Sequence, residues 1–373
     1  MKEMELFLPE YPQKSDMWDA LFCETRPILI YGMGNGADKL IKKFNELGIS
    51  FSDIFASDGF VRGHSFHGVR VKSFSEIKEL YSDFVIVLSF ASNRREVLDL
   101  LREIDEKYDM YIPDMPVAGE EYFDKKFYNE NYEKIVSAYN SLFDEESRKL
   151  FVSVIKYKLS GKMKYLCTNN SEESEIYSLI KSKGEIRHII DGGAYNGDTL
   201  REAIEYFEKL EKCELFEPDK RNFKKLKAFS EGIEHPETSL YNKALWNSVG
   251  TGTFFGSGNR NSSINSTASH EKRDDTVETT SVDEWKIRAV DYIKYDVEGA
   301  EYEALEGSSE TILRDKPALL VSAYHRSRDI FYLINYAREK YPFYKVFLRR
   351  IYCVPAWECD IILIPTLENE HET

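Results

Sequence analysis

An apolar segment that runs into a glycine-rich turn, at residues 189–199, constrains the fold of this chain more than any other feature. Ile189 and Ile190 precede Asp191, and the turn continues as Gly192-Gly193-Ala194-Tyr195-Asn196-Gly197-Asp198-Thr199. A helical pattern follows to about Leu210, and a second apolar run, 213–216, ends at the acid Glu217. Strand, tight turn, helix, strand and acid form the first half of a nucleotide-binding α/β unit. The segment therefore predicts an open parallel sheet that binds its ligand at the carboxyl ends of its strands.

The rest of the C-terminal half continues this pattern. Apolar runs predict five strands, at 186–190, 213–216, 240–245, 290–296 and 317–323. A hairpin-like insertion, 252–255 with 276–282, carries a polar loop, 256–275, of the kind that is usually solvated and can serve as a lid. The last two predicted strands, 344–349 and 360–364, are close enough in sequence to pair antiparallel. A parallel sheet that ends in a hairpin is typical of class I methyltransferases rather than of NAD-binding domains.

A second glycine-rich turn, Gly32-Met33-Gly34-Asn35-Gly36-Ala37, lies near the N-terminus. It joins a predicted strand, 27–31, to a predicted helix, 38–47, and matches the G-x-G-x-x-A dinucleotide fingerprint. Asp58 follows the strand predicted at 52–56, at roughly the spacing of 20 residues where an acid meets a ribose hydroxyl. The pattern predicts either a second nucleotide or nucleotide-sugar site or a module whose glycines only form the turn. The site residues would be Gly32, Gly34, Asn35, Gly36 and Asp58.

This N-terminal stretch resembles a small Rossmann-like domain that is often attached to bacterial polysaccharide enzymes. The resemblance rests on the Y-G-x-G-x-x-A opening, on Asp58, and on Gly63 and Gly68 ahead of Val69-Arg70-Val71. It implies a setting rather than an activity.

Charge and cysteine content narrow the classes of function. The net charge of −15 disfavours nucleic acid as a partner, because duplex-binding proteins usually present a basic face. The five cysteines are scattered without a C-x-x-C pair, which predicts neither zinc nor disulfides and suits a reducing compartment. The N-terminus carries no secretion signal and the apolar runs are too short to span a bilayer, so we expect a cytoplasmic protein without a membrane span. The sequence does not indicate the oligomeric state.

Acids at the predicted strand ends favour S-adenosylmethionine (SAM) over a dinucleotide. They are Asp191, Asp198, Glu217, Asp296 and Glu298. Pyrophosphate is drawn to a helix N-terminus and free amides, and acids crowding the same turn oppose it. SAM is a cation at its sulfonium, and a carboxylate in the place of Glu217 accepts hydrogen bonds from two ribose hydroxyls. Any one of these acids alone could equally be a helix cap or a solvated strand end.

The C-terminal half resembles the FkbM family of SAM-dependent methyltransferases over about residues 140–365. The motifs that carry the resemblance are 190–199, Phe216-Glu217-Pro218-Asp219, Ala244-Leu245-Trp246, 293–301, and Ser322-Ala323-Tyr324-His325 with Asp329. The resemblance implies O-methyl transfer to a hydroxyl, often of a sugar or a polyketide. It also implies that the turn holds the methionine end of SAM, that Glu217 holds the ribose and that Lys243-Ala244 lies near the adenine. The cofactor-binding residues are then Asp191, Gly192, Gly193, Ala194, Tyr195, Gly197, Asp198, Glu217, Pro218, Lys243 and Ala244.

His325 is the predicted general base, because its unperturbed pKa suits proton abstraction from a hydroxyl. Asp296 or Glu298 could orient it or act as the base directly, and the three residues could alternatively hold a divalent cation, although no spaced metal-ligand set is visible. The predicted acceptor pocket includes Tyr324, Arg326 and Trp357. Arg349-Arg350 departs from the Arg-His pair that related chains often show.

Together these patterns predict an α/β fold of two Rossmann-like parts. A small domain at 1–118 is followed by a helical connector at 119–185 and a SAM-dependent methyltransferase domain at 186–373. The predicted function is O-methyl transfer to a sugar or another small hydroxyl-bearing acceptor, as in polysaccharide biosynthesis. Two alternatives stay open, an NAD- or nucleotide-sugar-dependent enzyme that uses the N-terminal turn, and a non-catalytic protein that binds SAM or a nucleotide sugar.

Overall fold

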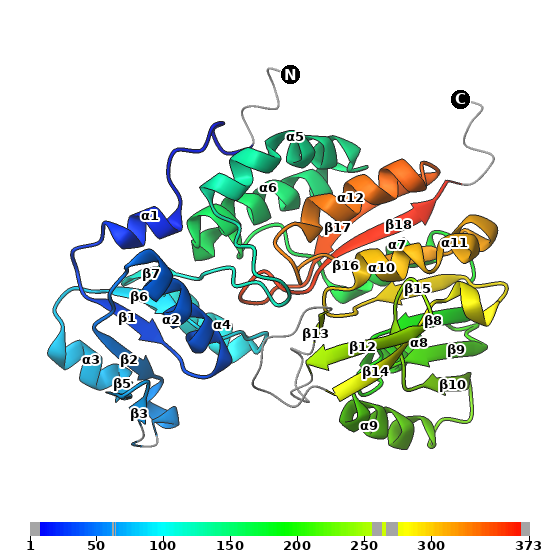
Figure 1. Ribbon diagram of the computed structural model, residues 1–373, viewed down its shortest axis with the longest axis horizontal. Coiled ribbons are helices and arrows are strands. Elements are labelled where there is room, and N and C mark those ends of the chain that lie inside the picture. The colour runs from blue at the N-terminus through cyan, green and yellow to red at the C-terminus, as the bar shows by residue number, and fades with distance from the viewer. Residues whose placement is uncertain (1–7, 62, 64, 256–262, 266–274, 367–373) are drawn as a thin grey trace.

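Two parallel sheets, one in each half of the chain, organise the structure (Figure 1). The computed structural model describes residues 8–61, 63, 65–255, 263–265 and 275–366. Both sheets grow from continuous apolar runs, as expected of parallel strands that are covered on both faces. The predicted α/β class, with a class I methyltransferase sheet behind a smaller Rossmann-like part, is confirmed.

The N-terminal sheet has five parallel strands in the order β5-β2-β1-β6-β7. The strands are β1 (Ile28–Tyr31), β2 (Asp53–Ala56), β5 (Lys72–Ser73), β6 (Val85–Leu88) and β7 (Asp109–Tyr111). Its helices are α1 (Met17–Phe22), α2 (Asn35–Leu47), α3 (Phe74–Leu80) and α4 (Arg95–Asp105), and a short hairpin joins β3 (Ser65–Phe66) to β4 (Val69–Arg70). Every residue of β1, β2 and β6 is buried; β1 and β6 carry no charged residue, and the buried Asp53 that begins β2 pairs with Lys72.

The C-terminal sheet has seven strands in the order β10-β9-β8-β15-β16-β18-β17. The strands are β8 (His188–Gly192), β9 (Lys212–Phe216), β10 (Glu237–Tyr241), β15 (Tyr292–Tyr295), β16 (Ala318–Ser322), β17 (Tyr344–Arg350) and β18 (Cys359–Pro365). The first five are parallel, and β18 pairs antiparallel with both β16 and β17. The helices are α8 (Asp198–Tyr206), α9 (Lys220–Ser230), α10 (Glu301–Glu306), α11 (Ser309–Asp315) and α12 (Asp329–Lys340). The predicted closing hairpin is therefore present.

The strand predicted at 240–245 is correct only to Tyr241, the last residue of β10, because the chain leaves the main sheet at Asn242. The side-chain amide of Asn242 donates to the carbonyl oxygens of Glu217 (2.8 Å) and Pro218 (3.1 Å). The chain then enters β11 (Ala244–Leu245), which pairs with β14 in a separate small sheet.

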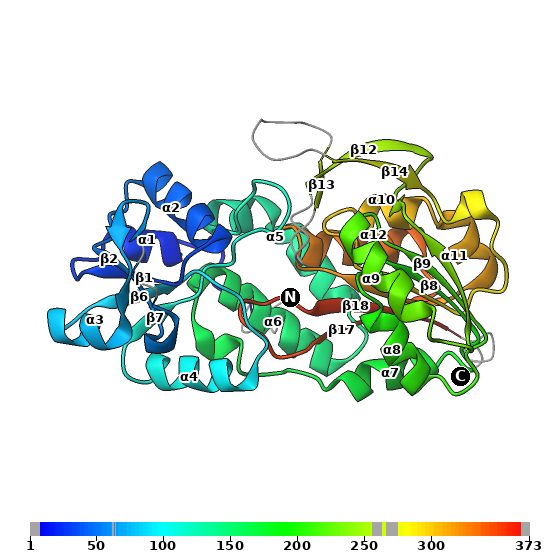
Figure 2. The ribbon, with the colours of Figure 1, turned by 90° about the horizontal axis from the view of Figure 1, so that it is seen from below.

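The predicted insertion forms this small sheet, which has the strand order β11-β14-β12-β13. Its other strands are β12 (Gly250–Phe255), β13 (Ser263–Asn265) and β14 (Asp275–Thr280), with β12 antiparallel to β14 as predicted. Most of the polar loop at 256–275 lies outside the described residues. Figure 2 shows β12 and β14 projecting from the body of the molecule.

The residues predicted as a helical connector form α5 (Lys125–Ser141), α6 (Glu145–Ser160) and α7 (Glu173–Lys181), and two of these helices are part of the core. One hydrophobic cluster joins Ile86 of the N-terminal sheet, Ile135 of α5, Phe151 of α6 and Val321 of the C-terminal sheet. A buried ion pair between Asp114 and Lys158 of α6 lies at the same junction. Both halves of the chain therefore contribute to one hydrophobic cluster.

Candidate functional site

The glycine-rich turn after β8 is held against the end of β15. Gly193 has φ +90°, and a Cβ atom added there would lie 1.9 Å from the carbonyl oxygen of Asp296. Only glycine allows this approach without a backbone shift. Gly197, also at positive φ, then starts α8. The turn therefore brings Tyr195 and Asp198 to the carboxyl ends of the neighbouring strands.

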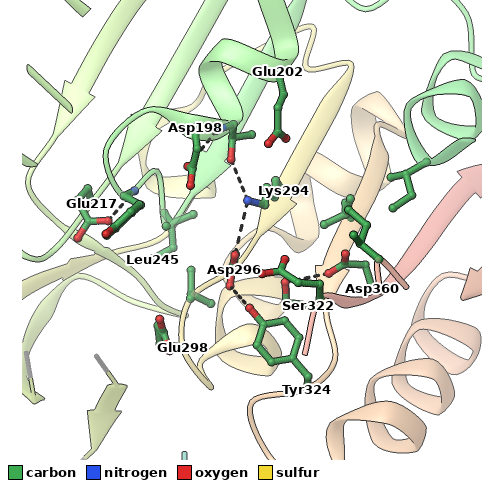
Figure 3. A pocket seen from close by; sticks show the side chains of 18 of the residues that line it. Asp198, Glu202, Glu217, Leu245, Lys294, Asp296, Glu298, Ser322, Tyr324 and Asp360 are labelled. Carbon is green, nitrogen blue, oxygen red and sulfur yellow. Dashed lines mark hydrogen bonds and ion pairs between the residues drawn. The ribbon is translucent and has the colours of Figure 1, made fainter. Parts of the chain in front are cut away.

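A cavity opens at these strand ends, and most of its polar lining is acidic (Figure 3). The acidic residues of the lining are Glu173, Asp198, Glu202, Glu217, Asp296, Glu298, Glu358 and Asp360. Lys294 lies among them, and its ammonium group donates to Thr199 Oγ1 (2.8 Å) and lies 3.6 Å from Asp296 Oδ2. Four of the five acids predicted to form a rim line the cavity; the fifth, Asp191, is buried behind the turn.

Asp191 is fully buried, and neither of its carboxyl oxygens has a hydrogen-bond partner among the described residues. Burial raises the pKa of this group to about 7. A buried polar group without a partner is costly and marks a place where a ligand group could bind.

Glu217 lies across the turn from β15 and is fixed by two backbone amides. Its carboxylate accepts from the N–H groups of Tyr195 (2.8 Å) and Asp219 (2.7 Å). Burial nevertheless raises the pKa of Glu217 to about 8. A carboxylate can accept about four hydrogen bonds, so Glu217 keeps capacity for hydroxyl donors in the cavity.

Of the two residues predicted to lie near the adenine, Ala244 lines the cavity and Lys243 does not. Pro218, Ala244 and Leu245 line the cavity, but the Lys243 ammonium group pairs with Glu278 (2.7 Å) and is not part of the lining. The lysine precedes β11, whereas both residues of that strand, Ala244 and Leu245, line the cavity.

His325 lies at the centre of a buried acidic cluster. Its Nδ1 atom is 2.9 Å from Glu301 Oε1, and its Nε2 atom is 3.4 Å from Asp296 Oδ1 and 3.5 Å from Glu298 Oε2. Burial would lower the pKa of His325, but the three carboxyl groups outweigh it and raise the pKa to about 10. The imidazole is therefore protonated at neutral pH, which conflicts with a simple role as general base.

Glu301, rather than Asp296 or Glu298, makes the closest contact that orients His325. The same Oε1 atom also accepts from the amides of Val297 (3.1 Å) and Gly299 (3.2 Å), so one buried carboxylate fixes both the turn and the imidazole. The predicted site residues did not include Glu301. Its signal in the sequence is its place in Glu298-Gly299-Ala300-Glu301, directly after a predicted strand end.

Glu298 combines a strained backbone with a carboxyl group that lies beside His325. Its φ is +54°, an uncommon value for a residue with a side chain, and such strain clusters at functional sites. Its Oε2 atom is buried without a hydrogen-bond partner in the described part of the chain, and burial raises its pKa to about 8. Burial would raise the pKa of Asp296, but Lys294 and His325 outweigh burial and lower this pKa overall. The two acids therefore differ in basicity.

The three predicted acceptor residues occupy different places. The Tyr324 hydroxyl donates to Asp296 Oδ1 (3.3 Å) at the cavity (Figure 3). Arg326 Nε instead donates to the Gly299 carbonyl (2.7 Å) and supports the turn. Trp357 stacks near Tyr324, with ring centroids 6.5 Å apart, but lines a second cavity.

Asn35 and Gly36 of the N-terminal turn line the same second cavity as Trp357. Asp58, predicted as a ribose ligand, is not in its lining, because Asp58 accepts from the amide (3.0 Å) and hydroxyl (2.6 Å) of Ser75. Gly32 and Gly34 flank this turn at positive φ.

Several residues outside the predicted set contribute to the cavity or hold its frame. Asp360 of β18 accepts from Ser322 (3.0 Å), and burial raises its pKa to about 7. Arg349 and Arg350 have structural roles: Arg349 pairs with Asp144 before α6 (2.6 Å), and the buried Arg350 donates to the Cys353 carbonyl (2.7 Å). Within the described residues, no His, Cys, Asp or Glu group is arranged to hold a metal, and no helix is long and apolar enough to cross a bilayer.

Comparison with known proteins agrees with the fold. The family model "Methyltransferase FkbM domain" matches residues 191–344. The structure of Methyltransferase FkbM from Methylobacillus flagellatus KT is similar with a TM-score of 0.66 at 18% identity, covering 91% of this chain and 90% of that one. This similarity extends over both sheets. No curated protein matches the sequence.

Two further structures resemble the chain weakly. An rRNA methylase from Streptococcus thermophilus gives a TM-score of 0.33 at 10% identity, covering 51% of this chain and 94% of that one. A methyltransferase from Geobacter sulfurreducens gives 0.32 at 10% identity, covering 63% and 96%.

Proposed function

Residues 191–344 make this chain a member of the FkbM methyltransferase family, and from that premise we propose that it transfers the methyl group of SAM to a hydroxyl of a sugar or glycan precursor. The observation that carries the proposal is the acid-lined cavity at the strand ends, which joins Glu217 on one side to Asp296, Glu298 and His325 on the other. Open α/β sheets bind their ligands at this edge.

The lining suits a cationic nucleoside. Asp191 lacks a partner for both carboxyl oxygens, and in the proposal it lies behind the turn that holds the methionine end. Glu217 would accept the ribose hydroxyls, while Pro218, Ala244 and Leu245 would form the apolar wall beside the adenine. When bound, SAM supplies an activated methyl group on a good leaving group, so the protein has mainly to align the acceptor and remove its proton.

Glu298 is the proposed proton acceptor. It lines the cavity, its Oε2 atom makes no hydrogen bond within the described residues, and its pKa of about 8 lies close to the working range in which a general base is most effective. The hydroxyl proton passes to this carboxylate as the acceptor oxygen takes the methyl group. His325, protonated and held by Glu301, positions the side chains of Glu298 and Asp296. The role first predicted for His325 therefore moves to its neighbour in this proposal.

Calorimetric titration with SAM and with NAD tests the cofactor. Wild-type protein should bind SAM, and Glu217→Ala should weaken binding by about tenfold or more, because two hydrogen bonds to a charged group are lost. Glu278→Ala is the matched control, since Glu278 is an exposed acid paired with Lys243 outside the cavity. NAD binding without any response to SAM would overturn the proposal. The alternative NAD or nucleotide-sugar site gains no support from Asp58, whose carboxylate is bound to Ser75.

A further inference from the structure

A second cavity, of about 350 Å³, lies where the N-terminal turn meets the C-terminal hairpin. We call it the junction cavity. Its lining comes from four segments far apart in sequence: the start of α2, the end of β6, residues 112–117 and the loop between β17 and β18. This loop is tied to the N-terminal half by paired backbone hydrogen bonds between Ser92 and Val354 (2.7 and 2.9 Å). The cavity therefore exists only because the two halves of the chain pack together.

The junction cavity lies beside the cluster formed by His325, Asp296 and Glu298. Val117 lines it, and the amide of Val117 donates to the carbonyl oxygen of His325 (3.0 Å). On the other side, Trp357 lines the cavity and its ring stacks near that of Tyr324, whose hydroxyl reaches Asp296 (3.3 Å). Val117 and Trp357 therefore each contact a residue, His325 or Tyr324, that also contacts the carboxylates at the strand ends.

The lining has the composition of a site for a small hydroxylated ring. Most of the wall is apolar, and Phe90 and Trp357 contribute aromatic surface. Pockets for small molecules combine such walls with a few polar groups that fix orientation. Asn35 and Lys39 bring polar side chains to the lining, and the indole N–H of the lining residue Trp357 is buried without an acceptor among the described residues. Aromatic faces bind the apolar face of a sugar ring, and buried donors of this kind bind its hydroxyls.

The N-terminal glycines serve this cavity by close packing. A Cβ atom at Gly36 would lie 2.0 Å from the Ser89 carbonyl oxygen, and one at Gly32 would lie 2.7 Å from Phe90 Cδ1. The glycines therefore let the end of β6 approach α2 and place Phe90 in the cavity wall. Lys39 of α2 holds the lining segment 112–117 in place, because its ammonium group donates to the Pro116 carbonyl (2.7 Å).

We propose that the junction cavity is the acceptor site, and that it takes a monosaccharide ring between the N-terminal turn and Trp357 with one hydroxyl directed to Glu298. The proposal rests on the proposed methyl transfer, and it gives the N-terminal module a role in acceptor binding rather than in binding a second nucleotide.

The test measures transfer of a labelled methyl group from SAM to methyl glycosides of glucose, galactose, mannose and rhamnose. Wild-type protein should methylate at least one of them. Trp357→Ala should raise KM for that glycoside by about tenfold or more through the loss of stacking, and Trp357→Phe by a few-fold through the loss of the N–H donor. Phe90→Leu reports on another wall if Trp357→Ala fails to fold. Phe143→Ala, an exposed aromatic residue outside this cavity, should leave KM unchanged.

The outcomes separate the two proposals. The affinity for SAM should be the same in all of these variants. Transfer with an unchanged KM in Trp357→Ala and Phe90→Leu would overturn the assignment of the cavity alone. Binding of SAM without transfer to any of the glycosides would overturn the monosaccharide class, and absence of SAM binding would remove the proposed function itself.

Discussion

At the scale of single residues, Glu298 and its raised pKa define the expected pH dependence of the reaction. A base with a pKa of about 8 is mostly protonated at neutral pH, so the rate should rise with pH and level off above about 8. Glu298→Gln should lower kcat by about 10²–10⁴-fold and remove this rise. Initial rates between about pH 6 and about 9.5 measure this pH dependence. A Glu298→Gln profile that keeps the rise would assign the pKa to another group.

Glu301 should control the charge of His325. Removing its negative charge in Glu301→Gln should lower the pKa of His325 from about 10 toward the ordinary value of 6.5. NMR titration of the histidine ring protons measures this directly, with His325→Ala to identify the resonance and Glu306→Gln on the same helix as the control. His325→Ala should also reduce methyl transfer while SAM affinity persists. Near wild-type transfer in His325→Ala would show that the imidazole has no part in the reaction.

The unpartnered Asp191 should cost stability at neutral pH. Its pKa is about 7 in the folded protein against 3.8 ordinarily, so unfolding releases a proton between these values and stability falls as pH rises from about 4 to about 7. Asp191→Asn removes this loss and should be more stable by about 1–3 kcal/mol at pH 7.5, with little difference near pH 4. Denaturant titrations at the two pH values test it. Equal gains at both would show that ionisation is not the cause.

At the scale of elements, the sequence predicts well where the geometry of one strand decides the outcome. Parallel strands covered on both faces must be continuously apolar, so β1, β6, β8 and β15 were all predictable to within a few residues. The same rule places acids at strand ends, which is why Glu217, Asp296 and Glu298 could be recognised as site candidates. The break between β10 and β11 was not predictable, because it depends on hydrogen bonds from Asn242 to a distant segment.

The same limit applies to the rest of the site. Asp360 carries no local signal that separates it from other acids, and the place of Glu301 after a predicted strand end does not reveal its partner, because the roles of both come from the hydroxyl and imidazole that the fold brings to them. The packing of α5 and α6 into a shared core is likewise a property of the assembled sheets.

The turn after β8 offers a prediction at this scale. Gly193→Ala places a Cβ against the Asp296 backbone and should cost several kcal/mol more than Gly48→Ala. Gly48 also has a positive φ, at the end of α2, but a Cβ there meets nothing within 4 Å, so only the conformational cost of about 1 kcal/mol applies. Thermal denaturation of both variants measures the difference. Equal losses would mean that the turn can move away from β15.

At the scale of the whole molecule, the shared core predicts that both sheets unfold together. Asp114, which follows β7, pairs with Lys158 of α6 in the apolar junction, and the Ile112 amide donates to the Gly161 carbonyl (2.8 Å). Asp114→Ala leaves the Lys158 charge buried without its partner, which should cost about 3–5 kcal/mol. Because the junction belongs to both halves, this loss should lower the stability of both sheets by the same amount.

Hydrogen exchange resolved by mass spectrometry separates the two sheets. Peptides that cover β1 and β8 should show equal free energies of opening in the wild type, and equal decreases in Asp114→Ala. Asp83→Ala, an exposed acid of the N-terminal half, is the control and should leave both unchanged. Early exchange of β1 with β8 still protected would show that the N-terminal sheet opens independently. An acceptor site built at the junction requires the first result, since its walls come from both sheets and must be ordered together before the acceptor binds.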